Sequence, residues 1–215
     1  MPPSYESFPA VTDVLQWLDW AGIAVFALTG ALVAARKHMD PFGFALLGTV
    51  TGIGGGTLRD VLLGERPVPW ISDPTPVFIC LAVAALAFFT AHHFARGSRA
   101  SILLWADAIG LALFTVTGTA KALNVGAPPA AAIMMGVVTA TFGGIIRDIL
   151  AGDVPMALRR DVYVTAALAG AIVFIVANQF MYFAIDDILG FTTVFVIRGL
   201  AIVHGWSLPQ YDREA

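Results

Sequence analysis

Long stretches of this chain carry no charged side chain. The run from Phe42 to Leu58 is one of them, and only 13% of the 215 residues are charged while 58% are hydrophobic. Soluble domains average about 25% charged residues, so this chain lacks the side chains that keep a protein surface in water. A helix needs about 20 apolar residues to cross about 30 Å of hydrocarbon. The sequence therefore predicts a polytopic membrane protein and excludes an ordinary soluble domain.

Charges, prolines and polar clusters divide the apolar sequence into windows of helical length. We predict an all-α polytopic membrane protein with a single membrane domain, residues 1–215, and seven transmembrane helices near 18–35, 42–63, 76–95, 102–123, 129–150, 162–183 and 188–206. Because seven is an odd number, the two termini are expected on opposite sides of the membrane.

Lysine and arginine gather in alternate connections between these windows. One side would hold Arg36, Lys37, Arg96, Arg99, Arg159, Arg160 and Arg213, and the other would hold Arg66, with Lys121 at its rim. Cytoplasmic connections are usually the basic ones, so we expect the N-terminus outside and the C-terminus in the cytoplasm. The N-terminal segment has no Lys or Arg before Arg36 and so lacks the pattern of a cleaved secretory signal. The first span is expected to be retained.

The chain contains an internal repeat at an offset of 88 residues. Without a gap, 18 of 49 positions are identical between residues 19–67 and 107–155, and the matches include Gly, Pro and Arg-Asp positions as well as apolar ones. Each copy holds three spans, so the second copy enters the membrane in the opposite direction. We predict a first three-helix repeat at 18–95, a second, inverted one at 102–183, and a seventh helix at 188–206.

The charges agree with this inversion, since Arg36 and Lys37 in one copy correspond to Asn124 and Val125 in the other. Inverted repeats often enclose a solute path near the membrane midplane. Duplication is also a simple way to build a helix bundle that has no solute path.

The second and fifth windows are rich in glycine. They read GTVTGIGGGTLRDVLLG from Gly48 and GVVTATFGGIIRDILAG from Gly136. Glycine has low helix propensity, so we predict a kink or an unwound turn at Gly54, Gly55 and Gly56 and again at Gly143 and Gly144. Irregular backbone at membrane depth is tolerated when it is buried or lines a wet cavity. The alternative is a dry notch where two helices pack closely.

Each glycine segment is followed by an Arg-Asp pair, Arg59–Asp60 and Arg147–Asp148. Neighbouring helical residues point about 100° apart, so the two members of a pair are not expected to face each other. Charges inside a span are costly unless paired or wet, and these four could line two vestibules or lock the helix ends. Alternatively, each arginine reaches to the membrane surface along its own stem.

Two further basic residues lie within predicted spans. Lys121 corresponds to Val33, so duplication does not explain it, and it shares a helix face with Phe114 and Thr117. It could reach the interior between the glycine helices or extend to the membrane surface. Arg198 lies within the seventh window, and we expect it to be a topological anchor or a lipid contact.

Other site chemistry has little support in the sequence. No nucleophile motif, nucleotide-binding loop or metal-ligand spacing is present, so we expect neither an enzyme nor a metal site. The net charge of -3 with no basic cluster gives no sign of nucleic-acid binding. The single cysteine, Cys80, has no partner for an internal disulfide.

The segments FALTGALVAARK, GTVTGIGGGTLRDVLLGERP, FTVTGTAKAL and VVTATFGGIIRDILAGDVP resemble the prokaryotic trimeric intracellular cation (TRIC) channels, whose domain also carries the name glycine transporter. The resemblance implies a homotrimer in the inner (plasma) membrane of a prokaryote, with one pore in each protomer. It implies passive conduction of monovalent cations with potassium preferred, and no cofactor beyond permeant K⁺ or Na⁺ and bound membrane lipid. The pore would lie between the kinked second and fifth helices, lined or gated by Thr51, Thr139, Lys121, Phe26 and Phe114.

Three functions follow as hypotheses, and the weakest of them is a non-conducting lipid-binding or scaffold protein. The first is a potassium-permeable channel in which backbone carbonyls and threonine hydroxyls replace part of the hydration shell of the ion. The second is a secondary transporter for a small zwitterion such as glycine, in which one repeat rocks against the other.

Overall fold

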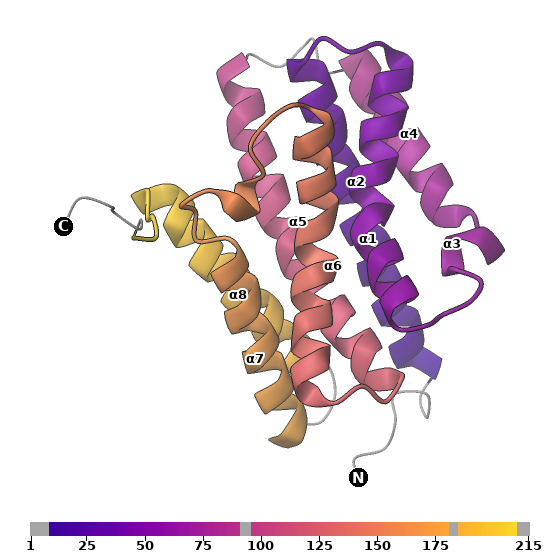
Figure 1. Ribbon diagram of the computed structural model, residues 1–215, viewed down its shortest axis with the longest axis vertical. Coiled ribbons are helices and arrows are strands. Elements are labelled where there is room, and N and C mark those ends of the chain that lie inside the picture. Colours follow the sequence, from indigo (N-terminus) through magenta and orange to yellow (C-terminus); the bar gives the residue numbers. More distant parts are fainter. Residues whose placement is uncertain (1–8, 91–95, 181–184, 210–215) are drawn as a thin grey trace.

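The computed structural model describes residues 9–90, 96–180 and 185–209, and this part of the chain is almost entirely helical (Figure 1). Its elements are α1 (Pro9–Arg36), α2 (Pro41–Leu62), α3 (Pro69–Ser72), α4 (Thr75–Thr90), α5 (Arg96–Asn124), α6 (Pro129–Leu150), the 3-10 turn η3 (Met156–Leu158), α7 (Val164–Phe180) and α8 (Ile185–His204).

The apolar windows of the sequence correspond to the longer helices. The windows at 42–63 and 129–150 match α2 and α6 to within one residue. Helices α1 and α5 begin before their windows, at Pro9 and Arg96, because a change in hydropathy does not by itself end a helix. The predicted windows at 76–95 and 162–183 extend into residues outside the described part of the chain. Arg213 of the basic set also lies outside it.

Helix ends are set by the same residue types in both repeats. Pro41 and Pro129 each occupy the first turn of their helix, where a missing N–H costs nothing. Gly64 and Gly152 follow the ends of these helices with φ values of 79° and 71°, a conformation that glycine adopts without a steric penalty. The shared start and stop signals explain why α2 and α6 have the same length.

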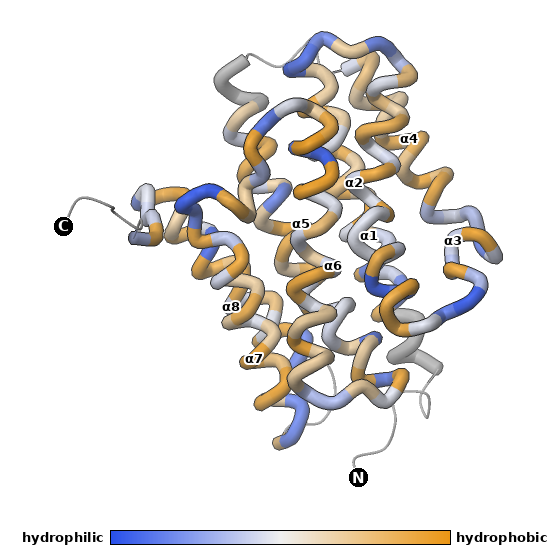
Figure 2. Tube along the Cα trace, viewed as in Figure 1, coloured by the Kyte–Doolittle hydropathy of each residue, from blue (hydrophilic) through white to orange (hydrophobic). Residues whose placement is uncertain are grey.

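Three described segments are long and apolar enough to cross a membrane: Leu15–Arg36, Ala100–Asn124 and Pro129–Leu150. Helices α4 and α7 are apolar but shorter. Hydrophilic residues gather mainly in the connections between helices, whereas the helix middles are apolar (Figure 2). This distribution suits a bundle whose sides face lipid.

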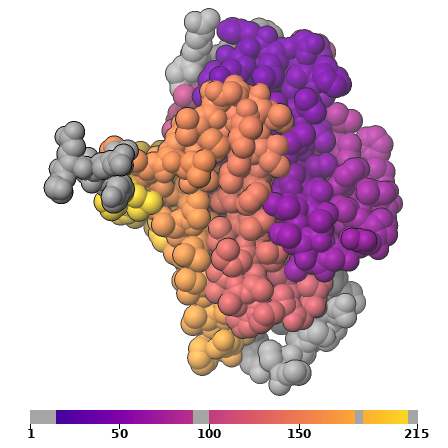
Figure 3. Space-filling model, viewed as in Figure 1, coloured from indigo at the N-terminus to yellow at the C-terminus, as the bar shows by residue number. Residues whose placement is uncertain are grey.

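The centre of the bundle is formed by the paired helices of the two repeats. Helix α2 packs on α6 and α1 packs on α5, and the members of each pair run in opposite directions (Figure 1). Helices α7 and α8 lie on one side of this centre, and α3 and α4 lie on the other (Figure 1); the space-filling view shows the same order of colours across the molecule (Figure 3). Related elements of the two repeats therefore meet face to face.

Reciprocal glycine contacts fix the crossing of α2 and α6. A Cβ atom at Gly55 would collide with the carbonyl oxygen of Thr139, and one at Gly143 would collide with the carbonyl oxygen of Thr51. These four residues form two repeat-related pairs, so the backbones touch at equivalent points. Both glycine segments are α-helical throughout, so an unwound turn at either of them is wrong, and the kink stays a prediction. The α2–α6 contact holds both segments in helical form despite their low propensity.

A pair of phenylalanines fills the middle of the molecule. Phe26 on α1 and Phe114 on α5 are buried and meet edge to face, with ring centroids 5.0 Å apart. Each ring also covers a glycine of the other repeat, Gly110 under Phe26 and Gly22 under Phe114. The centre between the two repeats is therefore closed by aromatic rings.

The crossing predicts unequal effects of two neighbouring alanine substitutions. Gly55→Ala should destabilise the protein by about 1–3 kcal/mol, because its Cβ has no space against the α6 backbone. Gly56→Ala is the matched control, since its Cβ would meet only Arg59 Nη2 at 3.6 Å. Thermal unfolding in detergent measures both. Equal melting temperatures for the two variants would contradict the close contact.

Candidate functional site

Two clusters of charged side chains lie at opposite ends of the α2–α6 pair. The first cluster comprises Asp19, Arg59, Asp60, Glu65 and Lys121. The second cluster comprises Asp107, Arg147 and Asp148 together with the hydroxyl of Thr29. Asp19, Arg59 and Asp60 correspond to Asp107, Arg147 and Asp148 at the 88-residue offset, so the clusters are two copies of one arrangement.

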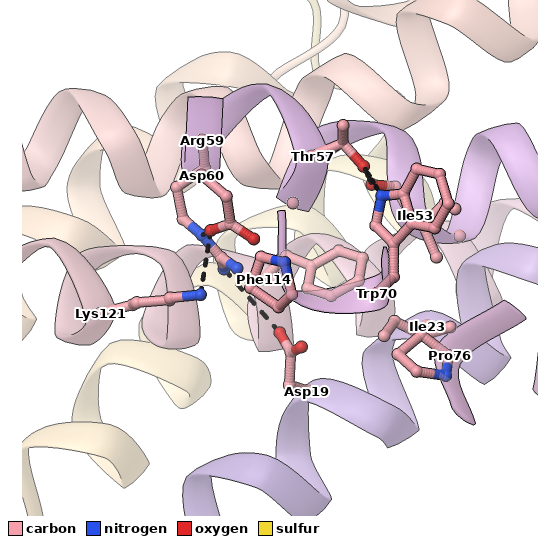
Figure 4. Close-up of a pocket in the computed structure, with 13 residues that line it drawn as sticks. Asp19, Ile23, Ile53, Thr57, Arg59, Asp60, Trp70, Pro76, Phe114 and Lys121 are labelled. Carbon is pink, nitrogen blue, oxygen red and sulfur yellow. Dashed lines mark hydrogen bonds and ion pairs between the residues drawn. The ribbon is translucent and has the colours of Figure 1, made fainter. Parts of the chain in front are cut away.

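Arg59 and Lys121 share the acidic groups of the first cluster (Figure 4). Arg59 Nε lies 2.7 Å from Asp60 Oδ1, and its Nη1 lies 3.9 Å from Asp19 Oδ1. Lys121 Nζ lies 3.0 Å from Asp60 Oδ1 and 2.8 Å from Glu65 Oε2. The side chain of Asp19 is 32% exposed. This cluster is therefore partly open to water.

A hollow beside the first cluster forms what we term the first vestibule. It has two neighbouring parts that share Asp19, Arg59 and Lys121, one of about 70 Å³ and one of about 240 Å³. The smaller part reaches Gly52 and Gly56 on α2, Phe114 on α5 and Trp70 on α3 (Figure 4). Polar groups thus surround its entrance, and Phe114 lies at the centre of the bundle.

The second cluster repeats the two Asp and the Arg of the first but has no exposed side. Arg147 and Asp107 have side chains that are 0% exposed, and Arg147 Nη1 lies 2.8 Å from Asp107 Oδ1. The same Nη1 donates to Thr29 Oγ1 at 2.9 Å, and Arg147 Nε donates to Asp148 Oδ1 at 2.8 Å. The backbone N–H of Met156 donates to Asp148 Oδ2 at 3.0 Å. The turn η3 therefore covers this cluster.

The acidic residues that follow α2 and α6 at matched positions, Glu65 and Asp153, both pair with basic side chains. Glu65 bonds to Lys121, whereas Asp153 at the matched position bonds to Lys37 at 2.7 Å and to Arg36. The hydrogen bond from Lys37 lowers the pKa of Asp153 from its ordinary value. A lowered pKa keeps the carboxylate charged at neutral pH, so its stabilising effect is lost only as the pH falls below the ordinary value of about 3.9.

Some expectations for the charged residues are corrected by this geometry. Arg59 and Arg147 do bond to the neighbouring Asp60 and Asp148, because the long arginine side chain bends back along its helix. Neither arginine extends to the membrane surface, since both are buried. Arg198 is also buried and lies 5.3 Å over the ring of Tyr163, so it is not a lipid contact.

Asp19 and Asp107 are site residues that the sequence reasoning missed. They appear among the repeat identities, yet they lie in different helices from the Arg-Asp pairs and about 40 residues away from them. The available signal was the Asp at the same position in both copies of an apolar helix. An intramembrane charge needs a partner, so these residues could have been matched to the two arginines.

The remaining predicted site residues lie between the two clusters. Thr51 and Thr139 are buried at the crossing, and their hydroxyls donate to the carbonyls of Leu47 and Met135 in their own helices. Gly54 is partly buried against Ile146 of α6. Gly144 lies beside Arg147 and Tyr163. Within the described ranges, no group of three or more His, Cys, Asp or Glu side chains could hold a metal ion.

Comparisons with known proteins agree with this fold. The family described as "Glycine transporter" matches residues 16–92 and 104–179. The inner membrane protein YadS of Escherichia coli is 40% identical over 202 residues, which is 92% of this chain and 96% of that protein. A membrane protein of Vibrio cholerae is 42% identical over 203 residues, covering 93% and 84% of the two chains.

Two solved structures are similar along nearly the whole chain. The TRIC trimeric intracellular cation channel orthologue of Rhodobacter sphaeroides has a TM-score of 0.86 at 51% identity, covering 90% of this chain and 99% of that one. A structure described under conductance through TRIC cation channels has a TM-score of 0.82 at 32% identity, covering 93% and 98%.

The fold and its relatives define a multi-pass helical membrane protein of the TRIC class, which confirms the resemblance seen in the sequence. The chain belongs to the glycine transporter family.

The unequal burial of the two clusters predicts unequal effects of matched substitutions. Asp107→Asn leaves the buried Arg147 without its full partner and should cost about 3–5 kcal/mol of stability. Asp19→Asn at the matched position should cost about 1 kcal/mol or less, because the distance to Arg59 is 3.9 Å and the carboxylate is partly hydrated. Thermal unfolding of both variants in detergent tests this. The interpretation fails if Asp19→Asn is the more damaging change.

Proposed function

We propose that the protein is a monovalent cation channel that prefers potassium, with an hourglass pore between α2 and α6 in each protomer. The solved relatives are described as TRIC cation channels, and one was crystallised in 0.5 M KCl. The observation that carries the proposal is the first vestibule, a cavity lined by the charged residues Asp19, Arg59, Asp60 and Lys121 that also reaches Phe114.

The charge of the first cluster favours a cation. Asp19 and Asp60 line the first vestibule together with Arg59 and Lys121, so these charges balance, and Glu65, which pairs with Lys121 beside the vestibule, adds one negative charge. The excess of one negative charge in the cluster raises the local concentration of cations at low ionic strength. Asp19 is the group best placed for this effect, because its carboxylate is exposed in the vestibule and held least tightly.

The path continues through the centre toward the second cluster. It passes Phe114 and Phe26 and the crossing at Thr51 and Thr139. In the present conformation the aromatic pair and the buried second cluster close this route. Conduction therefore requires the two repeats to separate at the centre and at Arg147.

The arrangement in the membrane is part of the same proposal. Seven transmembrane helices form two inverted repeats, at 18–95 and 102–183, with a seventh helix at 188–206. The N-terminus lies outside and the C-terminus in the cytoplasm, which places the first vestibule at the outer face of the inner membrane. The protomers form a homotrimer surrounded by membrane lipids. The opposite directions of α1 and α5 support this arrangement, as do the description of the Rhodobacter sphaeroides relative as trimeric and that of the Escherichia coli relative as an inner membrane protein.

Planar bilayers test the channel directly. Purified protein should show unitary currents whose reversal potential follows the potassium gradient. Asp19→Asn should lower the unitary current by about two-fold in dilute KCl and by much less in concentrated KCl, because salt screens the lost charge. Asp73→Asn is the matched control, since Asp73 is exposed before α4 and outside the vestibule. Saturating flux without unitary current would contradict the channel.

A transporter of a small zwitterion remains the second candidate. The vestibule presents both a carboxylate, Asp19, and two cations, Arg59 and Lys121. A zwitterion such as glycine could pair with both signs there. Counterflow of labelled glycine across proteoliposomes, abolished by Lys121→Met, would favour this function over the channel.

A further inference from the structure

Tyr163 fills the space that would be a second vestibule. It lies between η3 and α7, is almost fully buried, and its ring belongs to the central apolar cluster with Phe26 and Phe114. A Cβ atom built on Gly144 would lie 3.4 Å from the Tyr163 hydroxyl and 3.5 Å from Arg147 Nη2. The tyrosine thus reaches the backbone of α6 beside the second cluster.

The matched position in the first repeat is open. Gly56 corresponds to Gly144 and lines the first vestibule, and a Cβ there would meet only Arg59 Nη2 at 3.6 Å. The residue matched to Tyr163 is Thr75, whose hydroxyl bonds to Asp73 at 2.6 Å at the start of α4. Thr75 does not line the vestibule. The tyrosine therefore accounts for much of the difference between the open and the closed end.

The final helix and the residues after it hold the segment that carries Tyr163. Arg198 of α8 stacks over the tyrosine ring, and its Nη1 donates to the Val162 carbonyl at 3.4 Å. Its Nη2 also lies 3.9 Å from Asp161. After α8, the N–H of Leu208 donates to the Arg160 carbonyl at 2.7 Å. Helix α8 has no counterpart in the repeats, so this support exists at one end of the bundle only.

Polar atoms around the tyrosine are poorly satisfied. Among the described residues, Arg147 Nη2 is buried and makes no hydrogen bond, and the buried Tyr163 hydroxyl interacts with the Asp107 carboxylate without a hydrogen bond of standard geometry. Buried polar groups in this state favour the entry of water. Withdrawal of the ring would let water reach all three, which lowers the cost of opening this end.

We propose that Tyr163 is the plug of the second vestibule and that Arg198 is the positioning residue that holds it in place. The proposal rests on the proposed function, because it assigns the closed end of the same path. It also gives α8 a role, since movement of this helix would release the ring.

Thiol labelling tests the plug without any current. Thr29→Cys places a reporter within the second cluster, where the native side chain is fully buried, and the native Cys80 is buried as well. The probe is the charged reagent methanethiosulfonate ethyltrimethylammonium, applied to protein in detergent. Adding Tyr163→Ala should speed labelling of the reporter by at least about ten-fold. Adding Tyr163→Phe should leave it slow, because the ring remains.

Two further variants complete the experiment. Arg198→Gln should also speed labelling, since the ring loses its support. Gln16→Cys, in the open first vestibule, is the control reporter and should react at the same rate with or without Tyr163→Ala. An equal rate at Gln16 and an unchanged elution volume would show that the fold is intact. If Tyr163→Ala proves unstable, Tyr163→Leu takes its place with the same expectation.

Either of two results would overturn the plug. One is a Thr29→Cys reporter that stays slow with Tyr163→Ala, and the other is one that already reacts fast in the native background. The outcome is separate from the channel proposal. Fast labelling in a protein that never conducts would leave the plug standing and reject cation conduction.

Discussion

The contact between the backbones of α2 and α6 is the constraint on which the other features depend. At Gly55 and Gly143 no side chain separates the helices, so Thr51 and Thr139 are pressed against the opposite backbone. In a membrane, close approach of this kind lets dispersion contacts hold helices together where the hydrophobic effect contributes little. It also sets the positions of Arg59 and Arg147, which lie one turn beyond the crossing at opposite ends.

Burial of those arginines then determines the rest of the interior. Each needs an acidic partner, and Asp19 and Asp107 supply it from α1 and α5. Each cluster also binds a threonine of the opposite repeat: the Thr117 hydroxyl donates to Asp19 in the first cluster, and the Thr29 hydroxyl accepts from Arg147 in the second. Each cluster is thus assembled from both halves of the chain, so any separation of the halves must disturb the charge pairing. This links motion at the crossing to hydration at the ends.

The sequence predicted the helices and the repeat better than the contacts between side chains at the two clusters. Hydropathy and the shared Pro and Gly positions located α2 and α6 almost to the residue, because these signals are local. The unwound turns were wrong because helix propensity is local as well, while the reciprocal contact at Gly55 is not. The partners of Arg59 and Arg147 were missed for the same reason, since they lie on other helices. The plugging position of Tyr163 depends on how one loop folds back, and the repeat offset pairs it only with Thr75.

The two ends of the molecule differ although most of their residues are the same. Lys121 at one end and the tyrosine held by Arg198 at the other give a bundle of near-symmetric halves a definite polarity. A preparation in which molecules insert into vesicles in both directions therefore exposes the first-cluster end of some molecules and the second-cluster end of others to the same solution. Any reagent or ion added from one side would act on a mixed population, and the direction of a response would average out unless the insertion is made uniform.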